Sequence, residues 1–262
     1  MDNNKPLLES VEPDYINEMT VKREPIEKAK AMAGAFGTTI ISFGALAGAA
    51  YGQSNKLPGK IVDVLNFALT LEFLEDEFYR AALGSGRLIP RETQGVFEQI
   101  SKHETAHVNL LRSVLGGKAV AKPNFDFTAG GAFADVFRNY QTFLAVSQAL
   151  EDTGVRAYKG QAGNLRSNDK ILTTALQIHS VEARHAAMVR RIRGDKPWIP
   201  GDSRGTLPAP TQPVYNGEGN TTQGGVNIAT LPGVPSSIVA SQTFDEPLSK
   251  AEVLAIAGLF IR

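Results

Sequence analysis

The chain contains no cysteine, and this absence excludes several classes of protein. Disulfide-bonded scaffolds, cysteine-ligated zinc, iron–sulfur clusters and thiol catalysis all depend on that side chain. Histidine is scarce as well, with four residues in a chain of 262. Any metal site must therefore combine carboxylates with these few imidazoles.

The chain also lacks an excess of charge of either sign. Its 27 Lys and Arg residues balance 27 Asp and Glu residues, so the formal net charge is zero. Such a chain has no general attraction to polyanions, and we expect no nucleic-acid partner. The glycine motifs GxxxxGKS/T and GxGxxG are absent, so the glycine-rich stretches indicate no phosphate site.

The first of three predicted regions, residues 1–52, joins a polar stretch to the uncharged run AMAGAFGTTIISFGALAGAA at 31–50. This run has the length of a membrane span, but alanine and glycine make it weakly hydrophobic. Ala50, Tyr51 and Gly52 have the small-x-small spacing of a signal-peptidase site. We expect an export signal and a protein of the periplasm or cell envelope. The alternative is a cytoplasmic protein whose 31–50 helix is retained and meets a partner or a membrane.

The second region, residues 60–194, has the apolar spacing of helices almost throughout. The pattern predicts four helices, over 60–84, 91–116, 132–162 and 168–194. Short links join the first helix to the second and the third to the fourth, and a longer link, 117–131, joins the two pairs. This connectivity predicts an all-α protein, a four-helix bundle with one long crossover.

The third region, residues 195–262, holds eight of the 14 prolines and forms a Pro/Gly-rich tail. Residues 201–243 are expected to be extended and loop-like, because so many prolines and glycines prevent a long helix. Ser249 and Glu252 then form a capping box before an apolar run, which predicts a short final helix. We expect the tail to wrap over the bundle and this helix to dock on it.

An internal repeat carries the most informative residues. Glu104-x-x-His107 aligns with Glu182-x-x-His185 at an offset of 78 residues. Glu72 and Tyr79 align with Glu151 and Tyr158 at an offset of 79. The bundle therefore consists of two similar helix pairs, and the repeat coincides with metal-binding types of side chain.

The spacing of these residues has a direct physical reason. Residues i and i+3 of a helix share a face, so Glu and His of each Glu-x-x-His pair can point at one ion. Four carboxylates on one core would repel one another unless cations neutralised them. Two such helices plus two single-Glu helices are a known pattern for two iron or manganese ions. The predicted ligands are Glu72, Glu104, His107, Glu151, Glu182 and His185.

Other candidates surround this set. Glu75 is either an extra ligand or part of a solvated face with Asp76 and Glu77. Tyr79 and Tyr158 either hydrogen-bond the ligands or simply pack in the core. We expect His103 and His179 to turn away from the ligand face, at the surface or behind the ligands. Asp152 is expected to be a surface charge.

The motifs VDVLNFALTLEFLEDEFY, KHETAHV and VEARHAAMVR, with FDEPLSKAEVLAIAGLFI at 244–261, resemble one family. They are similar to ferritin-like proteins that include the plant desiccation-related proteins and exported bacterial homologues. The resemblance implies a four-helix di-metal bundle, the six ligands named above and an N-terminal export signal. The long tail is unlike ferritin cages, so a 24-subunit storage shell is not expected.

Two classes of function follow. The first is a carboxylate-bridged Fe or Mn protein that handles dioxygen or peroxide, as an oxidoreductase of catalase or ferroxidase type, or that binds metal in stress protection. The second is a structural or assembly protein that self-associates through the bundle and its terminal segments and has a vestigial metal site. In either case we expect a homo-oligomer.

Overall fold

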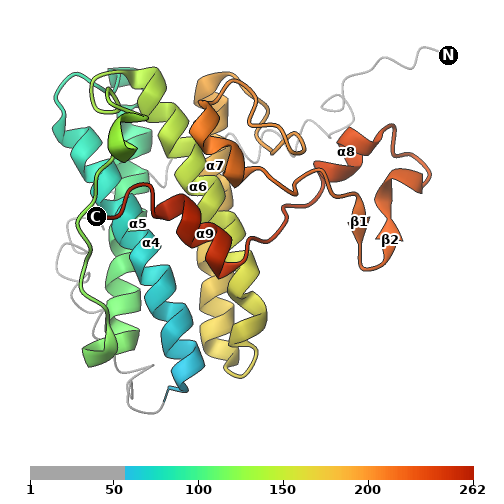
Figure 1. Ribbon diagram of the computed structural model, residues 1–262, viewed down its shortest axis with the longest axis horizontal. Coiled ribbons are helices and arrows are strands. Elements are labelled where there is room, and N and C mark those ends of the chain that lie inside the picture. The colour runs from blue at the N-terminus through green and yellow to red at the C-terminus, as the bar shows by residue number, and fades with distance from the viewer. Residues whose placement is uncertain (1–56) are drawn as a thin grey trace, which may run out of the picture. The chain divides into compact units, whose positions relative to one another are not determined.

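The computed structural model describes residues 57–262, so the predicted export signal or retained helix in 1–52 lies outside the described residues. Four long helices form the described core (Figure 1). They are α4 (Gly59–Gly84), α5 (Arg91–Leu115), α6 (Tyr140–Ala162) and α7 (Asp169–Arg193). The expected bundle with one long crossover is confirmed.

Local sequence signals set most helix ends. Pro58 and Pro90 precede α4 and α5, where a missing backbone N–H does no harm. The Asn168 side chain accepts a hydrogen bond from the Ile171 amide at the start of α7. Gly194 ends α7 at a left-handed φ of 81°, which glycine adopts without strain.

The predicted start of the third helix at residue 132 is wrong. Residues 132–138 form turns, and α6 begins at Tyr140. Asn139 is extended, and its side chain accepts a hydrogen bond from the Gln141 amide, so it caps the helix there. Phe133 and Val136 are buried at a helix-like spacing, which accounts for the misleading pattern.

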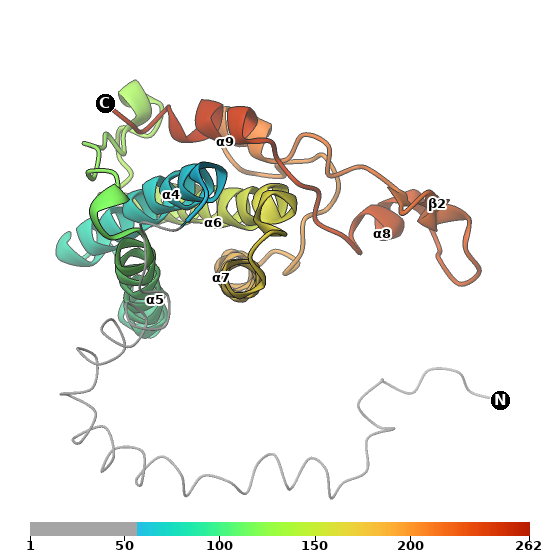
Figure 2. The same cartoon turned by 90° about the horizontal axis from the view of Figure 1, so that it is seen from below.

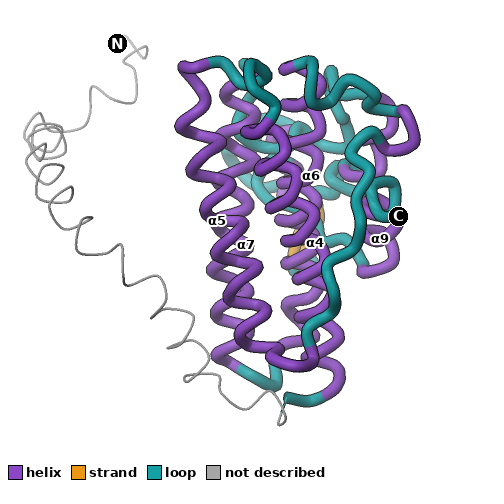
Figure 3. Tube along the Cα trace, turned by 90° about the vertical axis from the view of Figure 1, so that its left-hand side faces the viewer, coloured by secondary structure: helices purple, strands orange, loops and turns teal. Residues whose placement is uncertain are grey.

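The bundle consists of two antiparallel pairs, α4 with α5 and α6 with α7. Figure 3 shows the four helices side by side along their length. The crossover between the pairs contains two short 3-10 helices, Gly116–Lys118 and Ala129–Gly131. A third, Gly163–Leu165, links α6 to α7.

The tail has little regular structure before its last helix, as expected. It contains 3-10 helices Ala209–Val214 and Ile228–Thr230 and the short helix α8 (Ser237–Ser241). Strands β1 (Thr222–Gln223) and β2 (Val226–Asn227) pair antiparallel, with Thr222 opposite Asn227. Figures 1 and 2 show β1, β2 and α8 as an arm that projects from the bundle.

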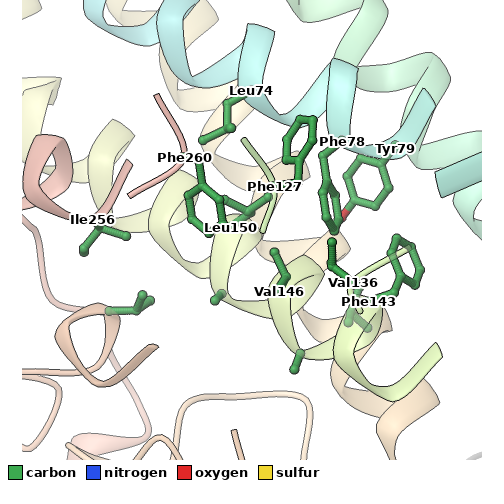
Figure 4. Packing of buried hydrophobic residues seen from close by; sticks show 14 of the residues in the cluster. Leu74, Phe78, Tyr79, Phe127, Val136, Phe143, Val146, Leu150, Ile256 and Phe260 are labelled. Atoms are coloured by element: carbon green, nitrogen blue, oxygen red, sulfur yellow. The ribbon is translucent and has the colours of Figure 1, made fainter. Parts of the chain in front are cut away.

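The final helix, α9 (Lys250–Ala257), docks on the bundle. It lies against α4 and α6, on the opposite side from α5 and α7 (Figure 2). The Ser249–Glu252 capping box is present in both directions. Ile256 and Phe260 pack in the same cluster as Leu74, Phe78 and Leu150 (Figure 4).

Two apolar clusters fill the bundle, and on α5 and α7 they occupy different stretches of the helix. One is rich in aromatic rings, including Phe78, Phe97 and Phe143, and the tail completes it. The other is aliphatic, with Leu65, Leu111 and others. The predicted ligands of α5 and α7 lie between the two clusters along these helices. Among the described residues, none of the helices combines the length and hydropathy that a membrane span requires.

Candidate metal centre

Six carboxylate and imidazole groups meet in the middle of the bundle. Helix α4 contributes Glu72 and α6 contributes Glu151. Helices α5 and α7 each contribute one Glu-x-x-His pair, because a spacing of three puts both side chains on the inward face. All six residues are buried, and the four glutamates have no exposed surface.

The first half of the site surrounds His107. Its Nδ1 atom lies 3.1 Å from Glu72 Oε2, 3.2 Å from Glu104 Oε2 and 3.2 Å from Glu182 Oε1. Ligand-type atoms of these four residues all lie within 4.8 Å of one another. The group therefore has the size and the donor types of a cation site.

The second half repeats this arrangement around His185. Its Nδ1 atom lies 3.0 Å from Glu104 Oε1, 3.2 Å from Glu151 Oε2 and 3.5 Å from Glu182 Oε2. These four residues also offer atoms within 4.8 Å of one another. Glu104 and Glu182 belong to both halves, and each directs one oxygen toward each histidine. The sequence repeat is thus expressed as two related half-sites that share two carboxylates.

The donor set fits divalent cations. Each Nδ1 atom carries at most one proton, but three carboxylate oxygens approach it. Among the described residues, Glu104 Oε1 and both carboxylate oxygens of Glu182 are buried without a hydrogen bond. Unsatisfied buried anionic oxygens are costly, and a cation between them would satisfy them. Carboxylates with two imidazoles suit iron or manganese.

The close packing of buried carboxylates and imidazoles also shifts the pKa values of the cluster. Burial, together with the charge of Glu182, raises the pKa of Glu104 well above its usual value. Burial raises the pKa of Glu151 to about 7. Burial lowers the pKa of His185, but the surrounding carboxylates outweigh it and raise that pKa to about 12. In the absence of a cation the cluster retains protons that metal binding would displace.

The two tyrosines support the outer carboxylates. The Tyr79 hydroxyl donates to Glu151 and lies 2.7 Å from Ser147 Oγ. The Tyr158 hydroxyl donates to Glu72. Each tyrosine therefore crosses to the glutamate of the neighbouring pair. Burial raises the pKa of both phenols, so they remain protonated donors.

One alternative placed Glu75, Asp76 and Glu77 on a solvated face of α4. This alternative is wrong for Glu75 and Asp76, which are both buried. Glu75 is 3% exposed and Asp76 is 7% exposed. Burial and four neighbouring carboxylates raise the pKa of Glu75. Gly154 on α6 provides its space, since a Cβ atom there would lie 3.3 Å from Glu75 Oε1. Asp76 accepts a hydrogen bond from Thr105.

The remaining polar candidates divide into two kinds. His103 lies behind a predicted ligand, with Nδ1 2.9 Å from His185 Nε2, and His179 Nδ1 lies 2.9 Å from the Val155 carbonyl.

The expected surface position of Asp152 is wrong, because this residue is 2% exposed. It pairs with Arg190 and accepts a hydrogen bond from Tyr215. Sequence periodicity did not predict the burial of Asp152, because the residue lies on the outer face of α6 and the tail covers that face.

Comparison with known proteins agrees with this architecture. Residues 60–195, about half of the chain, match the family model described as a ferritin-like domain. The comparison with curated proteins finds no match. The matched range spans α4 to α7 and includes all six residues of the buried cluster. The chain therefore belongs to the family of ferritin-like domains.

Proposed function

We propose that the protein binds two iron or manganese ions and uses them to reduce dioxygen or to decompose peroxide. The observation that supports this most strongly is the sharing of Glu104 and Glu182 between two half-sites. A single cation would leave one half of the cluster without compensation. Two cations would balance four carboxylates and use every ligand.

The residues have distinct roles in this proposal. Glu104 and Glu182 would bridge the ions, and Glu72 with His107 and Glu151 with His185 would each complete one side. When bound, the ions supply one-electron oxidation and reduction at two adjacent positions. Tyr79 and Tyr158 hold the outer carboxylates by hydrogen bonds. The buried apolar residues packed around the ligands would limit the access of water to the site.

The first experiment is elemental analysis of protein purified without added metal or chelator. We expect about two Fe or Mn ions per chain. Glu104→Ala and His185→Ala should lose metal, and Glu98→Ala should keep it. Glu98 is the matched control because it lies exposed on the same helix as Glu104. A fully loaded Glu104→Ala protein would contradict the assignment.

The identity of the metal selects the second assay. Iron would favour oxidation of Fe²⁺ by dioxygen, and manganese would favour disproportionation of peroxide. Protein loaded without oxygen and then mixed with each oxidant should react with one of them. A loaded protein that reacts with neither would overturn the redox proposal and leave a metal-binding protective role.

An assembly role is a second candidate, and the projecting arm favours it. Several large apolar side chains are exposed to solvent in the described part of the chain. Four of them lie on the arm: Val226, Leu231, Ile238 and Val239. Exposed apolar groups that gather on one feature are typical of interaction sites. We propose a homo-oligomer that uses this arm. Ile238→Ser should lower the mass measured by light scattering, and Leu254→Ser on α9 is the control.

A further inference from the structure

A small apolar cavity lies inside the bundle next to the proposed metal centre. All four helices line it, through residues that include Ala68, Leu71, Leu111, Tyr158, Ala175 and Ile178. Leu71 directly precedes Glu72, and Leu111 and Ile178 are each four residues from a predicted ligand. Tyr158 belongs to both places, because its ring lines the cavity and its hydroxyl donates to Glu72.

The size and lining of the cavity limit what it can hold. Its volume is about 30 Å³. An apolar cavity that accepts benzene has about 150 Å³, so an organic ring is too large. Buried water needs two to four polar partners, which this lining of mostly Val, Leu, Ile and Ala side chains does not offer. A diatomic apolar molecule meets both conditions.

Two residues that line the cavity are reached by solvent. Leu110 on α5 and Thr174 on α7 line it and are partly exposed, whereas its other lining residues are buried. The Thr174 hydroxyl donates to the Lys170 carbonyl. The other end of the bundle is packed with aromatic rings, and the Phe97 and Phe143 centroids lie 4.8 Å apart in an edge-to-face arrangement.

We propose that this cavity binds dioxygen and admits it to the Glu72 and Tyr158 side of the metal centre. The inference rests on the proposed function and deepens it by selecting the oxidant. Dioxygen is apolar and loses no hydrogen bonds on entering, whereas hydrogen peroxide would lose its hydrogen bonds to water. Reduction of one dioxygen to hydrogen peroxide takes two protons and two electrons, and two ferrous ions supply the electrons by losing one each.

Xenon tests the cavity without any metal, because it is an apolar probe for such sites. Xenon NMR on the full chain should show saturable binding. Ala175→Val and Ala68→Val each add two methyl groups to the lining and should abolish it. Ala81→Val is the matched control, since Ala81 is on the same helix as Ala68 and does not line the cavity. Equal xenon binding in the wild type and both filled variants would overturn the site.

Kinetics with ferrous-loaded protein test the delivery role. The filled variants should raise the KM for dioxygen roughly tenfold, as expected for blocking an apolar site, with metal content unchanged. Oxidation by added hydrogen peroxide should keep its wild-type rate. An unchanged KM for dioxygen would overturn the inference and leave the proposed function intact. Wild-type protein that binds xenon but never oxidises iron would overturn the proposed function, and the delivery role with it.

Discussion

Glu104 illustrates how a single residue connects charge and metal binding. Its two oxygens lie 3.2 Å from His107 Nδ1 and 3.0 Å from His185 Nδ1. It is also one of four mutually repelling glutamates without exposed surface. A residue in this position costs stability when no cation is bound and is required when one is. Glu104 is therefore expected to favour metal binding and to lower the stability of the metal-free protein.

Glu104→Gln tests this conflict in metal-free protein. Because the substitution replaces a buried carboxyl, which is costly to ionise there, with a neutral amide of the same shape, we expect the free energy of unfolding to stay the same or rise by about 1–3 kcal/mol. Urea denaturation with a chelator present measures it, with Glu98→Gln as the exposed control. A loss above about 2 kcal/mol would mean that the imidazoles stabilise the charged carboxylate.

Glu218 predicts a pH dependence away from the metal centre. It is buried, 2.8 Å from the Arg156 Nε atom, and burial raises its pKa to about 7. A carboxyl whose pKa is raised by folding stabilises the protein below its unfolded pKa and loses that contribution as the pH rises through the folded value. This part of the stability should fall by roughly 2 kcal/mol between pH 4.5 and pH 7.5.

Denaturation of the wild type and Glu218→Gln across this pH range measures the contribution. The glutamine variant cannot titrate, so the difference between the two proteins should grow as the pH rises. Parallel curves would show that Arg156 fully compensates the buried carboxylate.

At the scale of elements, α6 differs from the other helices because the tail covers its outer face. The Leu248 amide donates to the Arg156 carbonyl across this contact. The guanidinium of Arg156 donates to the carbonyls of Val214, Asn216 and Glu246. Almost every residue in the middle of α6 is buried in consequence. The tail is therefore part of the core.

Gly160 allows the tail to approach. A Cβ atom at this position would lie 2.0 Å from the Leu248 carbonyl oxygen, too close for the backbone to stay in place. Gly160→Ala should lower the free energy of unfolding by about 1–3 kcal/mol, as overpacking usually does. It should also speed proteolysis of residues 244–262.

Gly163→Ala is the control for this prediction. It adds the same methyl group three residues later, where nothing lies within 4 Å and φ is −60°. Its effect should stay within about 0.5 kcal/mol. Equal stability of both variants would show that the tail does not depend on close contact at Gly160.

For the whole molecule, metal binding should appear as added stability. A ligand at 100 times its Kd stabilises the folded protein by about 2.7 kcal/mol per site. Saturating Mn²⁺, or Fe²⁺ without oxygen, should therefore raise the Tm by roughly 10–20 °C when both proposed sites are filled. Mg²⁺ at the same concentration tests for general ionic effects, and Glu104→Ala should show little rise. An unchanged Tm in the wild type would count against a competent site.

Sequence patterns anticipated the bundle well where the information is local. Three of the four helices begin and end within about two residues of the predicted bounds. The exception is α6, where Asn139 ends a stretch of turns that has helical spacing. The capping box of α9 was readable because both partners lie within one turn. The burial of Asp152 could not be predicted in this way, because the tail segment that covers it, around Tyr215, lies some 60 residues further along the chain.

Local sequence patterns are enough to predict that this chain forms two similar helix pairs and that four glutamates and two histidines face inward. The reason is that helical period, capping and an i, i+3 spacing are properties of neighbouring residues. Packing between helices, in contrast, sets three features: Glu104 and Glu182 each approach both histidines, Glu75 is buried, and a cavity remains beside Tyr158. Those features depend on how side chains from separate helices and the tail fill one space.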